Sequence, residues 1–230
     1  MRFEELKDRL AGSPVFTVKD VSRLSGKPLS YARIMLYRLA KSGKVARVEG
    51  GKYCISGEDA FAVASSLIFP SYVSFLSALA FHHLTTQIPV EIQVACTRQK
   101  KPVVFSGMRI TFSKLKPRAM FGFKRVEHAF VAEPEKAVVD SLYLSGKTPV
   151  SEVLFALESG SLDAGKLDDY AKRVGSAAAM KRLGFLMEKA GMKTGIAPRA
   201  NTKTDFLNPL RPPKGERSAK WRLVINEVLE

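Results

Sequence analysis

Little in this 230-residue sequence is available to build a metal site or a disulfide. It has two cysteines, Cys54 and Cys96, with no Cys-x-x-Cys pair, and only three histidines. A structural zinc site needs four ligands at close spacing, and this sequence does not supply them. We therefore expect reduced, inert cysteines, no metal and no cofactor, in a cytoplasmic protein.

The sequence also lacks the short motifs of common catalytic chemistry. It contains no Gly-rich phosphate loop, no Gly-x-Ser-x-Gly and no His-Glu-x-x-His. Gly160-Ser161 followed by Asp168-Asp169 is only a faint nucleotidyltransferase signature, because adjacent aspartates on a strand point apart and could not share a metal ion. Glu133, Glu135 and Asp140 leave a nuclease open as an alternative, although the two glutamates also suit the start of a helix. We expect no enzyme.

Charged residues are missing from residues 60–90, a stretch long enough to span a membrane. Pro70 divides it, and five serines and a histidine pair interrupt its apolar character. We expect two buried helices here and no membrane segment. The mixed charges of residues 1–7 also predict no export signal.

Acidic residues are in short supply, since 37 Lys and Arg face 22 Asp and Glu, a net charge of +15. Residues 1–57 hold 12 basic and 5 acidic side chains, an excess of +7, against +3 over residues 58–140 and +5 over residues 141–230. Such a surplus favours a polyanionic partner, nucleic acid above all. The N-terminal quarter carries nearly half of it.

Residues 1–57 show the pattern of three helices followed by a hairpin. We expect a short helix over residues 3–10, a second helix capped by Thr17 with Asp20 three residues on, and a third capped by Ser30 and ending near Lys41. Apolar residues recur at helical spacing in the third helix, which leaves its other face exposed.

Two alternating segments, residues 45–49 and 52–55, flank Gly50-Gly51, a two-residue turn that suits a hairpin. Pairing outward from this turn sets Glu49 opposite Lys52, Val48 opposite Tyr53, Arg47 opposite Cys54 and Ala46 opposite Ile55. One face is then apolar, and the other carries Arg47, Glu49 and Lys52 in solvent.

A helix, a helix-turn-helix and a two-stranded wing form the winged helix-turn-helix arrangement, in which the third helix enters the major groove of DNA. Arginines there can bind guanine, whereas the lysines and the wing suit phosphate contacts. The expected DNA-binding residues are Ser30, Tyr31, Arg33, Tyr37, Arg38, Lys41, Lys44, Arg47 and Lys52. A merely solvated helix, or a winged helix that contacts only protein, is the alternative.

Between Glu91 and Glu127 the chain has nine basic residues and no acidic one. The same segment contains Val-, Ile- and Phe-rich strands, expected over residues 90–95, 103–105, 108–112 and 121–132. A second basic surface is therefore predicted, made of Arg98, Lys100, Lys101, Arg109, Lys114, Lys116 and Arg118. The alternative is scattered, solvated lysines.

The remaining chain is expected to be helical and then irregular. A helix should begin with Pro134 in its first turn, and three more should follow, opened by Ser151, Leu162 and Ser176. In the last of them we expect Lys181 and Arg182 outside. A long surface loop over residues 191–220 and a closing strand over residues 221–228 complete the chain. The fold class is thus α+β, with a winged helix at 1–57 and a mixed α/β domain at 58–230.

Four segments, in this order, are similar to segments of AbiEi-type antitoxins of abortive-infection systems: residues 71–89, 132–140, 181–188 and 220–226. The similarity covers the chain from about residue 14 to residue 228. It implies a transcriptional regulator whose winged helix represses its own operon and whose second domain counters a nucleotidyltransferase toxin encoded next door, without a stable complex. Arg33, Arg38, Lys41 and Arg47 carry over as DNA-contact candidates, and no catalytic residue does.

Three other hypotheses remain. The chain could be a winged-helix regulator with a sensor domain and no toxin, a DNA-processing enzyme, or an adaptor that binds only protein. The partners expected under the leading hypothesis are double-stranded DNA and, functionally, the toxin.

Overall fold

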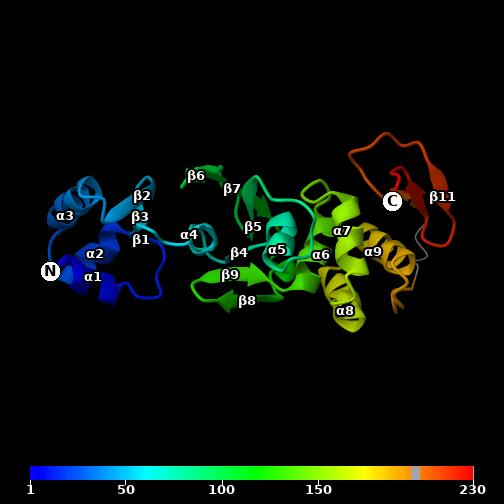
Figure 1. The fold of residues 1–230 in the computed structure, drawn as a ribbon, viewed down its shortest axis with the longest axis horizontal. Coiled ribbons are helices and arrows are strands. Elements are labelled where there is room, and N and C mark those ends of the chain that lie inside the picture. Colours follow the sequence, from blue (N-terminus) through cyan, green and yellow to red (C-terminus); the bar gives the residue numbers. More distant parts are fainter. Residues whose placement is uncertain (198–202, 230) are drawn as a thin grey trace.

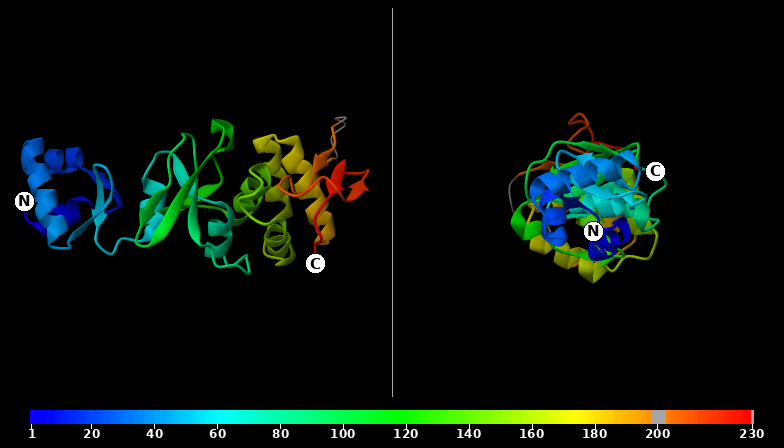
Figure 2. Two further views of the ribbon diagram at one scale, coloured as in Figure 1. Left: turned by 90° about the horizontal axis from the view of Figure 1, so that it is seen from above. Right: turned by 90° about the vertical axis from the view of Figure 1, so that its left-hand side faces the viewer.

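The elements of the chain are arranged in three groups along its longest axis (Figures 1 and 2). The computed structural model describes residues 1–197 and 203–229. A small helical unit with its wing lies at the N-terminal end, a six-stranded sheet lies in the middle, and helices with a small C-terminal sheet lie at the other end. The predicted fold class, α+β with an N-terminal winged helix, is confirmed.

The N-terminal unit contains three helices, α1 (Phe3–Arg9), α2 (Val18–Ser25) and α3 (Leu29–Lys41). Thr17 caps α2 as predicted: its hydroxyl accepts from the Asp20 N–H, and the Asp20 carboxylate accepts from the Thr17 N–H at 2.9 Å. The predicted cap at Ser30 is wrong. Pro28 precedes α3, and its carbonyl accepts from the Ala32 N–H, so Ser30 already lies within the first turn.

The wing consists of β2 (Val45–Glu49) and β3 (Lys52–Ile55), and β1 (Phe16–Thr17) pairs with the outer side of β3. Glu49 pairs with Lys52 as predicted, but a bulge at Val48 shifts the register beyond it. The other three predicted pairs are wrong, because Arg47 lies opposite Tyr53, Ala46 opposite Cys54 and Val45 opposite Ile55.

Both faces of the wing are covered. Val45, Tyr53 and Ile55 pack on the small cluster of the helical unit, formed around Leu6, Phe16, Val21, Ala32 and Leu36. Val48 and Cys54 instead belong to the large cluster of the C-terminal unit, the chain from residue 58 onward. The predicted division into domains at residue 57 stays a prediction, with the wing contributing to both clusters.

Charged residues also tie the wing to the C-terminal unit. Glu49 accepts from Lys52 Nζ at 2.9 Å and from Lys100 Nζ at 2.6 Å, and Lys52 Nζ donates to the Leu67 carbonyl. Lys100 also lies over the Phe112 ring, 5.4 Å from its centroid. We call Glu49, Lys52 and Lys100 the Glu49 clamp. Since Glu49 and Lys52 are half-buried in it, the prediction that both are solvated is wrong, and only Arg47 on that face is exposed.

The six-stranded sheet has the order β6-β7-β5-β4-β9-β8. Its strands are β4 (Ser71–Val73), β5 (Glu91–Cys96), β6 (Val103–Phe105), β7 (Met108–Lys114), β8 (Phe123–Val126) and β9 (Ala129–Ala132). A short 3-10 helix, η1 (Pro117–Ala119), follows β7. The strands predicted from composition are confirmed, except that residues 121–132 form two strands around a turn at Glu127 and His128.

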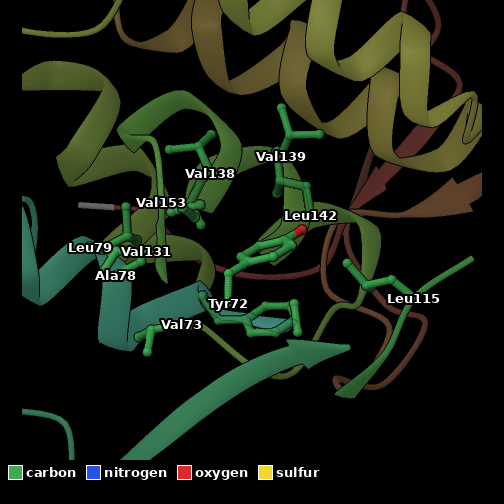
Figure 3. Packing of buried hydrophobic residues seen from close by; sticks show 14 of the residues in the cluster. Tyr72, Val73, Ala78, Leu79, Leu115, Val131, Val138, Val139, Leu142 and Val153 are labelled. Atoms are coloured by element: carbon green, nitrogen blue, oxygen red, sulfur yellow. The ribbon is translucent and has the colours of Figure 1, made fainter. Parts of the chain in front are cut away.

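The uncharged stretch forms the two predicted helices, α4 (Ala60–Ser66) and α5 (Phe75–Phe81), but also β4 between them, which was missed. In residues 1–197 and 203–229, no helix has both the length and the apolar character needed to cross a membrane. Tyr72 of β4 reaches into the packed interior beside Val138, Val139 and Leu142 (Figure 3).

The helices of the C-terminal end are α6 (Pro134–Tyr143), α7 (Val150–Glu158), α8 (Ala164–Val174) and α9 (Ala177–Lys189). Ser176 caps α9 as predicted, whereas α7 begins after Pro149 and the predicted Ser151 cap is wrong. Lys181 and Arg182 are buried, which contradicts the expectation that they lie outside. Lys181 Nζ bonds to Asp205 at 2.8 Å, and Arg182 donates to the Phe206 and Leu142 carbonyls.

Three short strands, β10 (Asp205–Phe206), β11 (Glu216–Ser218) and β12 (Leu223–Ile225), form a small sheet where a long loop and one closing strand were expected. Residues 198–202 of that loop lie outside the described residues. Trp221 is buried against Gly184 of α9, where a β-carbon would lie 2.1 Å from the indole Cη2 atom. Only glycine fits there, so two of the segments that carry the family resemblance pack on each other.

The Glu49 clamp gives a prediction about stability and pH. Burial alone would raise the pKa of Glu49, but hydrogen bonds from Lys100 and Lys52 outweigh it and lower the pKa. A lowered folded-state pKa stabilises the protein above the unfolded value and loses this effect as pH falls through the folded value. Glu49→Gln should therefore reduce the free energy of unfolding by about 1–2 kcal/mol at pH 7, and by much less below about pH 4.

Urea denaturation across this pH range measures the effect. The matched control is Glu5→Gln, because Glu5 pairs with Arg9 on an exposed helix surface at 3.0 Å. It should cost at most about 0.5 kcal/mol. Equal losses in both variants, or a Glu49→Gln loss that does not change with pH, would contradict the clamp.

Candidate nucleic-acid interface

Helix α3 lies in the N-terminal unit, at the end of the molecule opposite the C-terminal helices (Figures 1 and 2). Ala32 and Leu36 are buried beneath it. On the other side, Arg33, Tyr37 and Lys41 recur every four residues and therefore form one ridge. All three are exposed, Tyr37 to 69%. This face is long enough and free enough to lie against a duplex groove.

The cations of α3 are not neutralised by any residue that the structure describes. Arg33, Arg38 and Lys41 are exposed, and no ion pair among the described residues includes them. The α3 sequence itself contains no acidic residue. Ser30 and Tyr31 are also exposed, near the start of the helix. The structure thus brings all six residues predicted on α3 to one solvent-facing side of the helix.

The three predicted wing and turn residues separate. Lys44 and Arg47 are exposed, with Lys44 Nζ 5.1 Å from the centroid of the Phe3 ring. Lys52 is engaged in the Glu49 clamp, where it serves the contact between wing and C-terminal unit. We therefore expect Lys44 and Arg47 to be more available to phosphate than Lys52.

An apolar component of the interface was not anticipated as a site. Ile34 is 53% exposed, and Leu29, Tyr31 and Tyr37 are exposed beside it. Met1 and Phe3 join Tyr31, Ile34 and Arg38 around a shallow hollow of about 410 Å³. The signal in the sequence was Ile34 itself, an apolar residue three positions from two tyrosines on the polar side of the helix. Such side chains can pack on thymine methyl groups.

The second predicted basic surface divides by position. Lys100 is half-buried in the Glu49 clamp, whereas Arg98, Lys101, Arg109, Lys114, Lys116 and Arg118 are exposed. Cys96 pairs with Lys114, so the carboxyl ends of β5 and β7 lie side by side and place Arg98 near Lys114 and Lys116. Arg109 lies opposite Glu91 in the strand register, at the other end of β5 and β7. The rise per residue of a strand puts it roughly 17 Å from Lys114. Nucleic-acid binding by this surface stays a prediction.

Each acidic residue considered for a nuclease accepts a hydrogen bond within the protein, while Glu135 Oε2 is buried with no partner among the described residues. Glu133 accepts from Tyr170 and pairs with Lys124 at 2.9 Å; hydrogen bonds from Tyr170 and Lys124 lower its pKa. Glu135 accepts from the Asp163 N–H through Oε1. Glu133 and Glu135 thus lie at the start of α6, as their helix-start interpretation expects.

Asp140 is buried, and its carboxylate accepts hydrogen bonds from three side chains. It accepts from Tyr72 at 2.9 Å, from Ser74 at 2.8 Å and from Lys136. Burial raises the pKa of its carboxyl group in spite of these donors. The side chains of Lys136 and Asp140 have no exposed surface, which leaves no access for a substrate. In the described part of the chain, no three His, Cys, Asp or Glu residues form a group that could hold a metal ion.

Comparison with known proteins supports the winged-helix assignment. Residues 4–56 match a family described as "Transcriptional regulator, AbiEi antitoxin". No curated protein matches the chain significantly. The matched residues contain nearly all of α1, then α2, α3 and the wing, and therefore every residue placed on this face of the winged helix except Met1 and Phe3.

The whole fold has a counterpart among solved structures. The crystal structure of the RV2827C protein from Mycobacterium tuberculosis superposes with a TM-score of 0.60, covering 96% of this chain and 90% of that chain at 13% identity. At this identity the likeness concerns the fold alone. The N-terminal match says more than the fold likeness, because it concerns a family. Residues 4–56 of this chain match the AbiEi antitoxin family of transcriptional regulators, which confirms the resemblance predicted from the sequence.

Proposed function

We propose that this protein is a DNA-binding antitoxin of a toxin–antitoxin pair, which represses its own operon through the winged helix and counters a nucleotidyltransferase toxin. The observation that carries the proposal is the exposed, unneutralised cationic face of α3 inside the segment that matches the AbiEi family. The enclosure of Asp140 speaks against the alternative of a DNA-processing enzyme.

In this proposal α3 lies in the major groove. Arg33 and Arg38 reach guanine O6 and N7, and Lys41, Lys44 and Arg47 contact phosphates. Tyr31 and Tyr37 pack on sugars or thymine methyl groups. Ser30, near the start of the helix, hydrogen-bonds to the DNA backbone. The operator lies upstream of the gene for this chain. The toxin is a functional partner, without a need for a stable complex.

Arg38→Ala tests base recognition. If Arg38 reads a guanine, the variant should lose about 1–3 kcal/mol of binding free energy on the upstream DNA and much less on random DNA. Fluorescence anisotropy titrations with both duplexes measure this difference. The matched control is Lys189→Ala, an exposed cation of α9 at the far end of the molecule. Equal losses on both duplexes would make Arg38 a phosphate contact, and no preference of the intact protein for upstream DNA would reject repression.

Salt titration distinguishes Lys44, which precedes the wing, from Lys52 within it. Each phosphate contact contributes about 0.9 to the slope of log K against log salt concentration. Lys44→Gln should reduce the slope by about this amount, whereas Lys52→Gln should leave it nearly unchanged, because Lys52 is paired with Glu49. A larger change for Lys52 than for Lys44 would show that the clamp opens on DNA.

The antitoxin half is tested by co-expression with the nucleotidyltransferase encoded by the neighbouring gene. The chain should restore growth, and so should the variant Arg33→Ala/Arg38→Ala, because the proposed neutralising unit begins after the wing. Colony counts on inducing medium give the measurement, with loss of DNA binding verified on the same variant. Failure of the intact chain to restore growth would contradict this half. If the neighbouring gene encodes no such enzyme, the result favours a regulator without a toxin.

A further inference from the structure

A hollow of about 780 Å³ lies where the chain leaves the wing and enters the C-terminal unit. Its wall includes the linker residues Glu58 and Asp59, the first turn of α4, the end of α5 and the turn between β8 and β9. Ligand sites in proteins commonly enclose about 300–1,000 Å³. We call this feature the linker hollow. It shares no residue with the candidate nucleic-acid interface.

Aromatic and aliphatic side chains form one side of the linker hollow. Phe61 of α4 and Phe81 of α5 lie with their ring centroids 6.0 Å apart at an interplanar angle of 33°. Phe81 is 38% exposed, and Val126 across the hollow is 40% exposed. Large apolar side chains held in this half-open state offer surface to an apolar body, and aromatic faces attract cations.

The rim carries an acidic surplus, which is unusual in a protein with a net charge of +15. Glu58, Asp59 and Glu127 supply three carboxylates. His128 Nδ1 lies 3.5 Å from Glu58. The guanidinium of Arg125 is held by two carbonyls, those of Glu127 at 3.0 Å and of Gly12 at 3.2 Å.

The β8–β9 turn adds a local feature at this rim. Glu127 has a φ of 53°, a left-handed conformation that non-glycine residues adopt uncommonly. Such backbone positions persist where surrounding structure supports them, and they cluster at binding sites. Here the conformation places the Glu127 carbonyl on Arg125 and keeps its side chain exposed at the rim.

We propose that the linker hollow binds an organic cation with an aromatic or bulky apolar body. The apolar part lies against Phe61, Phe81 and Val126, and the charged part lies among the three carboxylates. Carboxylates attract a desolvated cation by their negative charge. The faces of aromatic rings attract it through the cation–π interaction. An organic anion would meet repulsion at the same rim.

This site touches two of the connections between the two units. The Glu58 N–H donates to the carbonyl of Ile55, the last residue of β3. Arg125 donates to the carbonyl of Gly12 in the loop between α1 and β1. An occupant that contacts Glu58 and the β8–β9 turn therefore biases the orientation of the N-terminal unit. Resting on the proposed function, this makes the cation a regulator of DNA affinity.

Calorimetry without DNA tests the site with a matched pair of probes. Tetraphenylphosphonium and tetraphenylborate have nearly the same shape and opposite charge. The phosphonium should bind at least tenfold more tightly than the borate. Since nonspecific attraction to a protein of net charge +15 favours the anion, this order can arise only from a local acidic site. Equal affinities or tighter binding of the borate would overturn the proposal.

Variants place the binding. Asp59→Asn/Glu127→Gln should weaken phosphonium binding at least fivefold; the new amide at position 59 can still accept from the Ala62 N–H that Asp59 caps at 2.9 Å. Phe81→Ala should weaken it as well. Asp169→Asn, an exposed acidic position on α8, is the control and should bind normally. Unchanged affinity in the hollow variants, or an equal loss in the control, would overturn the site.

A DNA titration with and without saturating tetraphenylphosphonium then tests regulation. A change in DNA affinity of threefold or more, absent in the Asp59→Asn/Glu127→Gln variant, is expected. Binding of the cation with unchanged DNA affinity would overturn the regulatory role. A protein that binds no DNA would refute the proposed function, while the calorimetric result would still decide the site.

Discussion

The arrangement of this molecule depends on a wing that is buried from both sides. In a free wing one face would be solvated, but here Val45 and Ile55 pack on the helical unit while Val48 and Cys54 pack on the C-terminal unit. The bulge at Val48 makes this possible, because it shifts the alternation of β2 by one residue. Helix α3 is thereby held at a defined place relative to the sheet, and the wing connects the helical unit to the C-terminal unit.

This connection changes the meaning of the net charge. Lys52 and Lys100 were both counted as cations for nucleic acid, yet they share one carboxylate, that of Glu49. Their charge stabilises a contact within the protein. Among the described residues the cations of α3 have no such partner, and their side chains are exposed to solvent. The net charge of the sequence does not say which cations have an acidic partner in the folded protein. The cations without such a partner are the ones that attract a polyanion.

Local signals were predictable from the sequence, and long-range partners were not. The capping box at Thr17, the glycine turn of the wing and the start of α6 at Pro134 each depend on neighbours a few residues away. The burial of Lys181 and Arg182 depends on Asp205 and Phe206, more than 20 positions along the chain. Their helical spacing gave no sign of these partners, since charged residues on a helix are ordinarily solvated.

The same distinction applies to the sites. Period and exposure placed the residues of α3 correctly on one face, because a helix fixes its own side-chain directions. The linker hollow could not be anticipated, since Glu58, Phe81 and Glu127 come from three separate segments that only the tertiary fold assembles. Its wall includes residues that join the two units, so a bound ligand can shift the equilibrium of the weak contacts between them. A surface ion pair or a single hydrogen bond is worth about 1 kcal/mol, so a ligand that favours one orientation by only about tenfold supplies a comparable energy.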